Sequence, residues 1–234
     1  MLFHVAIEIE NPARSIGWVL DHPGCFAYGD NADAALAAIP NAITDYAAWI
    51  VSRNQGNPLL ETSEIELLLT ETWDVYTIDD EFNPAQEGYE VNAWFRHDWK
   101  PLAEQELALG EKLLAWSRAD LLDAVSDLST EVLNAEHPGE RWNILGILRH
   151  VGGAEWWYLD RLGLGFPQQE VPKDPFERLE KVRARLLDIL PGLAGSRKVL
   201  GVDGEFWSPR KLLRRALWHE RDHTRHIHKL SGAR

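Results

Sequence analysis

The spacing of apolar residues changes near residue 100, from an alternation typical of strands to a helical period. In the first part, apolar and polar residues alternate in residues 2–9, 16–20 and 64–76, and a short strand is expected within residues 22–30. A two-residue period predicts half-buried strands. The alanine-rich stretch of residues 34–53 has helical spacing instead. We therefore predict three strands, a helix and a fourth strand, which is a small α/β domain of βββαβ type.

Two features interrupt this pattern. Pro40 lies inside the helical stretch, and proline removes a backbone hydrogen bond there, so a kink or a restart of the helix is expected. Residues 77–88 are polar and acidic and predict a loop. Residues 89–96 predict either a further strand or an extended connector that packs Trp94 and Trp99 between two modules. The boundary between the modules is expected near residue 100.

Beyond that boundary the apolar residues recur every three or four positions. Leu107, Leu114 and Leu121, for example, keep a heptad-like stripe on one side of a helix. Four such helices are expected, at residues 101–128, 141–162, 174–190 and 208–230. They predict an antiparallel four-helix bundle. The expected fold class is thus α+β with two domains, residues 1–99 and residues 100–234.

The last of these helices carries a pair of histidines. Ser208 is a favoured N-cap residue, Pro209 fits the first helical position, and Gly232 follows the last apolar residue. His219 and His223 share the side of the helix that carries the leucines, one turn apart. Two imidazoles at this spacing can meet one metal ion.

A third imidazole is expected from the second helix of the bundle. His150 lies midway along it, among the small residues Gly146, Gly153 and Ala154, which leave a hollow where a packed core would be filled. A lone histidine on a core-facing side is more often hydrogen-bonded structure than a ligand. Three histidines on two inward faces favour a metal site.

Charge separates the two parts further. The net charge is −13, and residues 1–99 hold 17 acidic residues against 3 basic ones, so the second part is nearly neutral. An acidic module repels phosphate backbones, which argues against nucleic-acid binding and favours a basic protein partner.

One cysteine, Cys25, fits a reducing compartment. The start lacks a leader pattern and no uninterrupted apolar run reaches about 18 residues, so we expect a cytoplasmic protein without a membrane partner.

The first part resembles the HicB-like antitoxin domain over residues 1–72. The resemblance is carried by the order of strands and helix, and by the stretch of residues 23–30 followed by the alanine-rich helix of residues 32–49. It implies a domain that engages another protein. In antitoxins of this type a DNA-binding segment usually follows, and none is visible here.

The second part, residues 100–234, resembles the DinB-like metal-binding four-helix superfamily. The resemblance is carried by Trp142 with His150 eight positions later, and by residues 206–210 at the entry to the helix of His219 and His223. Members bind a divalent metal through one residue of the second helix and an i,i+4 pair on the fourth. The resemblance therefore implies that His150, His219 and His223 are the ligands, and it allows for a homodimer.

Three nitrogen ligands leave a coordination position open, which is the arrangement of catalytic zinc. Zn, Ni and Fe all suit imidazole, and a bound ion lowers the pKa of bound water or of a thiol. The expected function is a metal-dependent enzyme acting on a small molecule, either a transferase or isomerase that uses a low-molecular-weight thiol, or a hydrolase.

Glu155 is the candidate catalytic base, or a carboxylate that orients an imidazole. His226 is either a ligand in place of His219 or a hydrogen-bonding group at the rim.

A function of another class stays open. In this alternative the protein is an antitoxin-like interaction module whose acidic domain captures a basic protein. The helical bundle then supports that domain, with a structural metal or with none.

Overall fold

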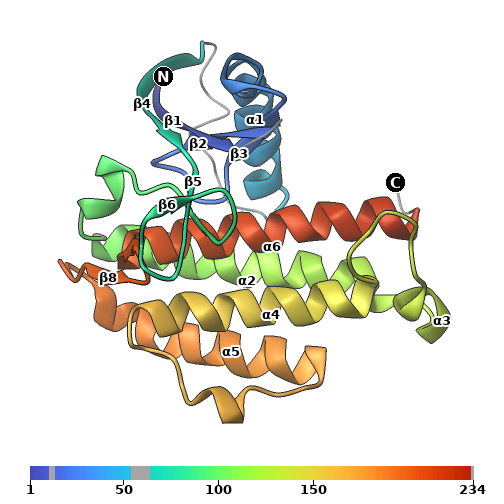
Figure 1. Cartoon of the computed structure of the whole chain (residues 1–234). Helices are drawn as coiled ribbons and strands as arrows, with labels where there is room; N and C mark the ends of the chain where they lie inside the picture. The colour runs from blue at the N-terminus through green and yellow to red at the C-terminus, as the bar shows by residue number, and fades with distance from the viewer. Residues whose placement is uncertain (11–13, 54–63, 233–234) are drawn as a thin grey trace. The chain divides into compact units, whose positions relative to one another are not determined.

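The computed structural model describes residues 1–10, 14–53 and 64–232, which form two compact units (Figure 1). The first unit consists of residues 1–99 together with residues 201–206. The second consists of residues 100–200 and the chain from Trp207 onward. The chain therefore leaves the helical unit between Leu200 and Trp207 to contribute a short segment to the first unit.

A four-stranded sheet forms the centre of the first unit. Its strands and the helix that packs on it are β1 (Leu2–Glu10), β2 (Arg14–Val19), β3 (Phe26–Gly29), α1 (Ala32–Val51) and β4 (Glu66–Asp74). The strand order is β3-β2-β1-β4, with β2 antiparallel to β1 and β3, and β4 parallel to β1. A parallel neighbour requires a crossover connection, and α1 lies in that connection. The predicted order of three strands, helix and strand is confirmed.

Helix α1 packs its apolar side on this sheet. Asn31 is its N-cap and accepts a hydrogen bond from the backbone of Ala34, while Ile39, Ile43 and Tyr46 are among its buried residues. The helix continues through Pro40, so the prediction of a restart there was wrong. Among the described helices, α1 is long and apolar enough to cross a membrane by length and composition alone, a property that a core helix shares.

The segment that follows the sheet contains more strand than the sequence predicts. Strands β5 (Tyr76–Ile78), β6 (Pro84–Ala85) and β7 (Tyr89–Val91) form a small antiparallel sheet, so the loop predicted for residues 77–88 was wrong in part. A buried carboxylate, Glu8 of β1, accepts hydrogen bonds from the indole of Trp18 (3.0 Å) and from the backbone of Ala93 (2.8 Å). These bonds fix the extended stretch after β7 to the central sheet.

Residues 200–207 form a hairpin ahead of the last helix. Strands β8 (Leu200–Val202) and β9 (Glu205–Trp207) pair with each other. Asp203 and Gly204 connect them, and both have positive φ, at 51° and 77°. An Asp-Gly pair with two positive φ angles is the favoured turn of a tight hairpin. The dipeptide was therefore a signal for this turn.

The second unit is built from helices. They are α2 (Glu104–Ser126), α3 (Thr130–Asn134), α4 (Ile144–Arg161), α5 (Pro175–Ile189) and α6 (Pro209–Ser231), with the short 3-10 helices η3 (Gln168–Glu170) and η4 (Leu190–Leu193). Helix α2 packs against α6, and α4 packs against both α5 and α6 (Figure 1). The helical second part is confirmed, while the antiparallel connectivity of a four-helix bundle stays a prediction.

Local signals in the sequence place the ends of α6. The hydroxyl of Ser208 accepts a hydrogen bond from the backbone of Lys211 (3.1 Å), Pro209 is the first helical residue, and Gly232 closes the helix with φ of 69°. A left-handed residue after the last turn favours glycine. At the far end of the unit, Ile227 of α6 packs into a core with Leu121 of α2 and Ile147 of α4.

Candidate metal centre

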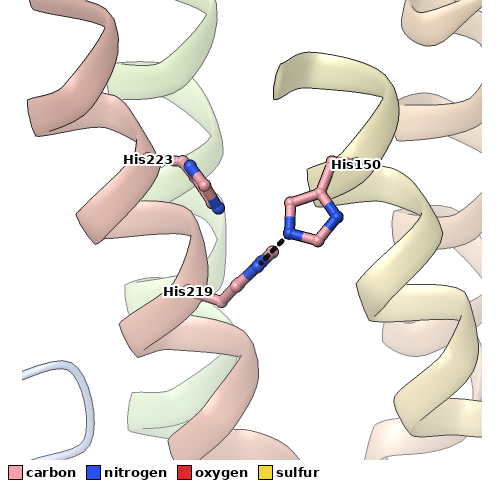
Figure 2. Close-up of side chains that lie close together, drawn as sticks. All are labelled: His150, His219 and His223. Atoms are coloured by element: carbon pink, nitrogen blue, oxygen red, sulfur yellow. Dashed lines mark hydrogen bonds between the residues drawn. The ribbon is translucent and has the colours of Figure 1, made fainter. Parts of the chain in front are cut away.

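Three imidazoles from two helices converge inside the second unit. His150 comes from α4, and His219 and His223 come from α6 (Figure 2). The Nε2 atoms of His150 and His219 are 3.0 Å apart. One ligand nitrogen from each of the three rings lies within 4.8 Å of the others. The structure thus brings together the three histidines that the sequence selected.

Helix geometry and packing position the three rings. His219 and His223 are four residues apart on α6, so they project from the same side of that helix. His150 reaches them because α4 packs against α6. Trp142, which precedes α4, stacks on the ring of His150 with centroids 4.4 Å apart and planes 27° apart. The indole therefore limits how the His150 ring can turn.

The environment keeps all three rings neutral at pH 7. Burial is the main cause for each, and it lowers the pKa of His219 well below 6.5 and that of His223 to about 3. The pKa of His150 is also lowered, first by burial and then by the positive charge of Arg141. Arg215 adds a further positive charge that acts on His219. Metal ions bind the neutral form of imidazole, so the protonation state suits a ligand.

Two of the donor atoms lie at the spacing that a metal ion requires, and the third is within 4.8 Å of them. An ion that binds nitrogens at about 2.0–2.1 Å in tetrahedral geometry needs them roughly 3.3 Å apart, close to the separation of the His150 and His219 nitrogens. His223 Nδ1 is buried without a hydrogen-bond partner among the described residues. The cluster is therefore able to hold a metal ion, and three imidazole nitrogens suit Zn, Ni, Fe and Cu alike.

Two cavities border the cluster, and both have His150, Gly153 and Ala154 in their walls. The larger, of about 400 Å³, is also lined by residues of α4 and α6, namely Trp157, Tyr158, Arg215, Trp218 and His219. The smaller, of about 290 Å³, is lined by Trp142, Gly146, Arg149 and Arg178 as well. The hollow predicted around His150 from its small neighbours is confirmed. An open position at the cluster would face a space large enough for a small molecule.

Glu155 lies outside this cluster. Its carboxylate accepts two hydrogen bonds from Arg183, at 2.9 and 2.7 Å, and a third from Arg118 at 3.2 Å. The residue is 3% exposed. These ion pairs support a structural role, whereas a general base needs a carboxylate that can take up a proton from the substrate. The catalytic role of Glu155 stays a prediction.

Its position beside His219 on the last helix predicts that Glu220 faces sideways or outward, whereas the structure buries it. It is 1% exposed, and its carboxylate accepts hydrogen bonds from Arg118 (2.6 Å) and Arg183 (2.9 Å). Burial acts to raise its pKa, but the two guanidinium groups outweigh burial and the pKa is lowered. The sequence contains a signal for this burial. Glu220 belongs to a set of residues spaced by four and three along α6, which places them on one side of the helix, and all of them are buried: residues 213, 217, 220, 224 and 227.

The fourth histidine near the cluster takes the rim position. His226 Nε2 is 3.0 Å from the carboxylate of Glu140, so His226 is hydrogen-bonded there. Its ring centroid is 6.0 Å from that of His223. The expectation of a hydrogen bond from the rim is confirmed.

Comparison with known proteins finds one family match, and it covers the segment that contains the cluster. The family model of the DinB superfamily matches residues 113–227, which contain all three histidines. This segment is therefore DinB-like. Comparisons with curated proteins and with solved structures each find no match. The HicB-like character of residues 1–72 stays a prediction.

Proposed function

We propose that His150, His219 and His223 bind one divalent metal ion, and that the protein is a metal-dependent enzyme acting on a small molecule. The candidate ions are Zn, Ni and Fe, which all accept imidazole ligands. The candidate reactions are transfer or isomerisation with a low-molecular-weight thiol, and hydrolysis. The DinB-like character of residues 113–227 supports this class of site.

The observation that carries the proposal is the convergence of three neutral imidazoles beside a cavity. Their nitrogens approach within 4.8 Å without a carboxylate or thiolate in the group. Bringing such rings together in a buried place costs desolvation, which a bound cation would offset. Three protein ligands and an adjoining space of about 400 Å³ match a catalytic site better than a closed structural one.

The residues around the cluster have defined tasks in this proposal. The metal ion, when bound, lowers the pKa of a water or thiol that it holds. Trp142 orients the ring of His150, and the aromatic side chains of Trp157 and Tyr158 give the cavity an apolar wall. Tyr158 is itself held by Trp207, which stacks on it with centroids 5.3 Å apart.

Metal content tests the proposal directly. The protein purified without added metal is expected to contain one divalent ion per chain by elemental analysis, and His150→Ala, His219→Ala and His223→Ala are each expected to lose it. The matched control is His226→Ala, which removes a neighbouring imidazole that binds Glu140 instead. Circular dichroism shows whether each variant keeps its helices. Retained metal in His150→Ala, or a wild-type chain that takes up no ion, would contradict the proposal.

The reaction class is tested with the metal-loaded protein. Product formation on a panel of electrophiles is measured with and without added thiol. Turnover that depends on thiol supports transfer, and turnover in its absence supports hydrolysis. Glu155→Gln is included, because a general base at this position predicts a loss of about 10²–10⁴-fold.

A further inference from the structure

The smaller cavity beside the cluster has two arginines in its wall. Arg149 comes from α4 and Arg178 from α5. Two glycines of α4 make room for the second of these side chains. A Cβ at Gly152 would lie 2.9 Å from Cγ of Arg178, and a Cβ at Gly153 would lie 3.4 Å from its Nη1 atom. Arg178 therefore lies close against α4, on the helix that also supplies Arg149.

Backbone carbonyls hold both side chains. Arg178 donates from Nε to the carbonyl of Pro172 (2.7 Å) and from Nη1 to the carbonyl of Arg149 (3.1 Å). Arg149 donates from Nε to the carbonyl of Lys173 (3.3 Å). A carbonyl carries no net charge, so these bonds position the guanidinium groups and leave their positive charges in full.

Each guanidinium keeps donors for a ligand. The Nη2 atom of Arg178 makes no hydrogen bond within the part of the chain that the structure describes, and it is accessible to solvent. Arg149 is an exposed residue, and its two Nη atoms make no hydrogen bond with a described residue either. Arginine presents these donors in a planar fork that matches the oxygens of an anion.

No carboxylate balances the charge at this cavity. Burial lowers the pKa of Arg178, and the positive charge of Arg149 lowers it further, so the two guanidinium groups repel each other. Asp174, one turn before Arg178, accepts hydrogen bonds from the backbone amides of Phe176 and Glu177 at the start of α5. Among the described residues, no aspartate or glutamate lines the cavity. An anion with more than one negative charge would relieve the repulsion.

We propose that Arg149 and Arg178 bind the phosphate group of a small phosphate monoester in the smaller cavity. Such a group carries a charge of about −1.5 to −2 at pH 7 and has three strong acceptor oxygens, so two arginines can share it. A carboxylate has one charge, which a single arginine satisfies. Trp142 and His150 line the same cavity and place the rest of the ligand beside the cluster.

The proposal deepens the proposed function by naming the class of substrate. It rests on that function only in calling the ligand a substrate, because two arginines can bind a phosphate without a metal. Arg149 and Arg178 are specificity-determining residues in this proposal.

Calorimetric titration of the metal-free protein at pH 7.5 tests the site with three probes that share a benzene ring. They are phenyl phosphate, benzoate and benzyl alcohol, which differ in charge. We expect phenyl phosphate to bind about 10-fold more tightly than benzoate, and benzyl alcohol to bind most weakly. Arg149→Gln and Arg178→Gln are each expected to lose about 10- to 100-fold in affinity for phenyl phosphate, and Arg178→Lys to lose less.

The matched control is Arg185→Gln, which changes the same residue type on the same helix as Arg178. Arg185 lies outside both cavities and pairs with Asp188, so this variant should bind phenyl phosphate as the wild type does. Circular dichroism shows whether each variant keeps its helices. Arg149 is exposed and Arg178→Lys keeps the charge, so these two variants test the site even if Arg178→Gln is unstable.

The same titrations on the metal-loaded protein separate this site from the metal site. Affinity for phenyl phosphate that depends on both arginines supports the proposal even if the chain takes up no ion, in which case the metal assignment alone is wrong. Uptake of an ion with equal binding of phenyl phosphate and benzoate would overturn the phosphate site and leave the metal site standing. Binding of phenyl phosphate that needs the metal and survives in Arg149→Gln would also overturn it, since the metal would then hold the phosphate.

Discussion

The histidines of this chain differ in role because their surroundings differ. Three of them form the cluster of the second unit, and His226 binds Glu140. In the first unit, Asp21 is flanked by His4 at 2.7 Å and by His97 at 3.2 Å. The hydrogen bond with His97 is the main cause that lowers the pKa of Asp21. Residue type alone thus does not separate a candidate ligand from a structural imidazole.

The buried ring of His22, in the first unit, has a pKa that should affect stability. Burial lowers its pKa below 6.5, and the negative charge of Asp21 offsets this in part. Its ring lies against Phe3, with centroids 5.5 Å apart, and against Tyr46. The unfolded chain takes up a proton at His22 below pH 6.5 while the folded chain does not, so stability falls as the pH drops through 6.5, by at most about 1.4 kcal/mol per pH unit.

The measurement is thermal unfolding between pH 7.5 and 5.5. We expect His22→Gln to lose less stability over this range than the wild type, because the buried neutral ring is gone. His228→Gln, which replaces an exposed histidine on α6, is the control and should follow the wild type. Parallel curves for His22→Gln and the wild type would show that His22 does not contribute.

At the level of the elements, four charged residues join the long helices of the second unit. Each helix supplies one of them: Arg118 from α2, Glu155 from α4, Arg183 from α5 and Glu220 from α6. Burial acts to lower the pKa of Arg183, but the charges of Glu155 and Glu220 outweigh it and the pKa is raised. Each carboxylate faces both guanidinium groups, so the charges balance within the network.

Removing one member should leave each of its partners buried with one ion pair fewer. We expect Arg183→Met to lower the free energy of unfolding by about 3–5 kcal/mol, because both carboxylates lose a partner. Arg185→Met, two residues along the same helix at the surface, should cost less than about 1 kcal/mol. Urea unfolding compares the two variants. Equal midpoints would contradict a structural role for the network.

At the level of the whole molecule, the chain passes between its two units more than once. Residues 201–206 belong to the first unit although they lie between helices of the second. Glu205 anchors this segment, since its carboxylate accepts hydrogen bonds from the hydroxyl of Tyr89 (2.8 Å) and from the backbone of Asn92 (3.0 Å). A fragment that ends at Trp99 therefore lacks part of the first unit.

Glu205→Ala tests the importance of this segment. The loss of a buried acceptor leaves the Asn92 amide without it, and we expect the region around β7 to be destabilised by about 1–3 kcal/mol. Amide hydrogen exchange should rise in residues 76–92 and stay unchanged in α4 and at the histidine cluster. Glu87→Gln, an exposed change in the same region, serves as the control. Unchanged exchange at Asn92 would show that Glu205 does not hold this part of the unit.

Local chemistry was enough to predict much of the secondary structure and the placement of two of the three histidines of the cluster. The period of apolar residues, the cap at Ser208 and the glycine at position 232 place α6, and the four-residue spacing puts His219 and His223 on one side of it. These signals depend on neighbours within about one helical turn, so the sequence contains them in full. The Asp203-Gly204 turn is of the same kind, although it was missed.

The tertiary structure decided which of those elements contact one another. The approach of His150 to His219 requires α4 to pack on α6, and the pairing of Glu220 with Arg118 and Arg183 requires three helices at once. The placement of residues 201–206 with the first unit depends on partners more than a hundred residues away. Such contacts are set by burial and charge balance over the whole fold, which no local pattern of residues encodes.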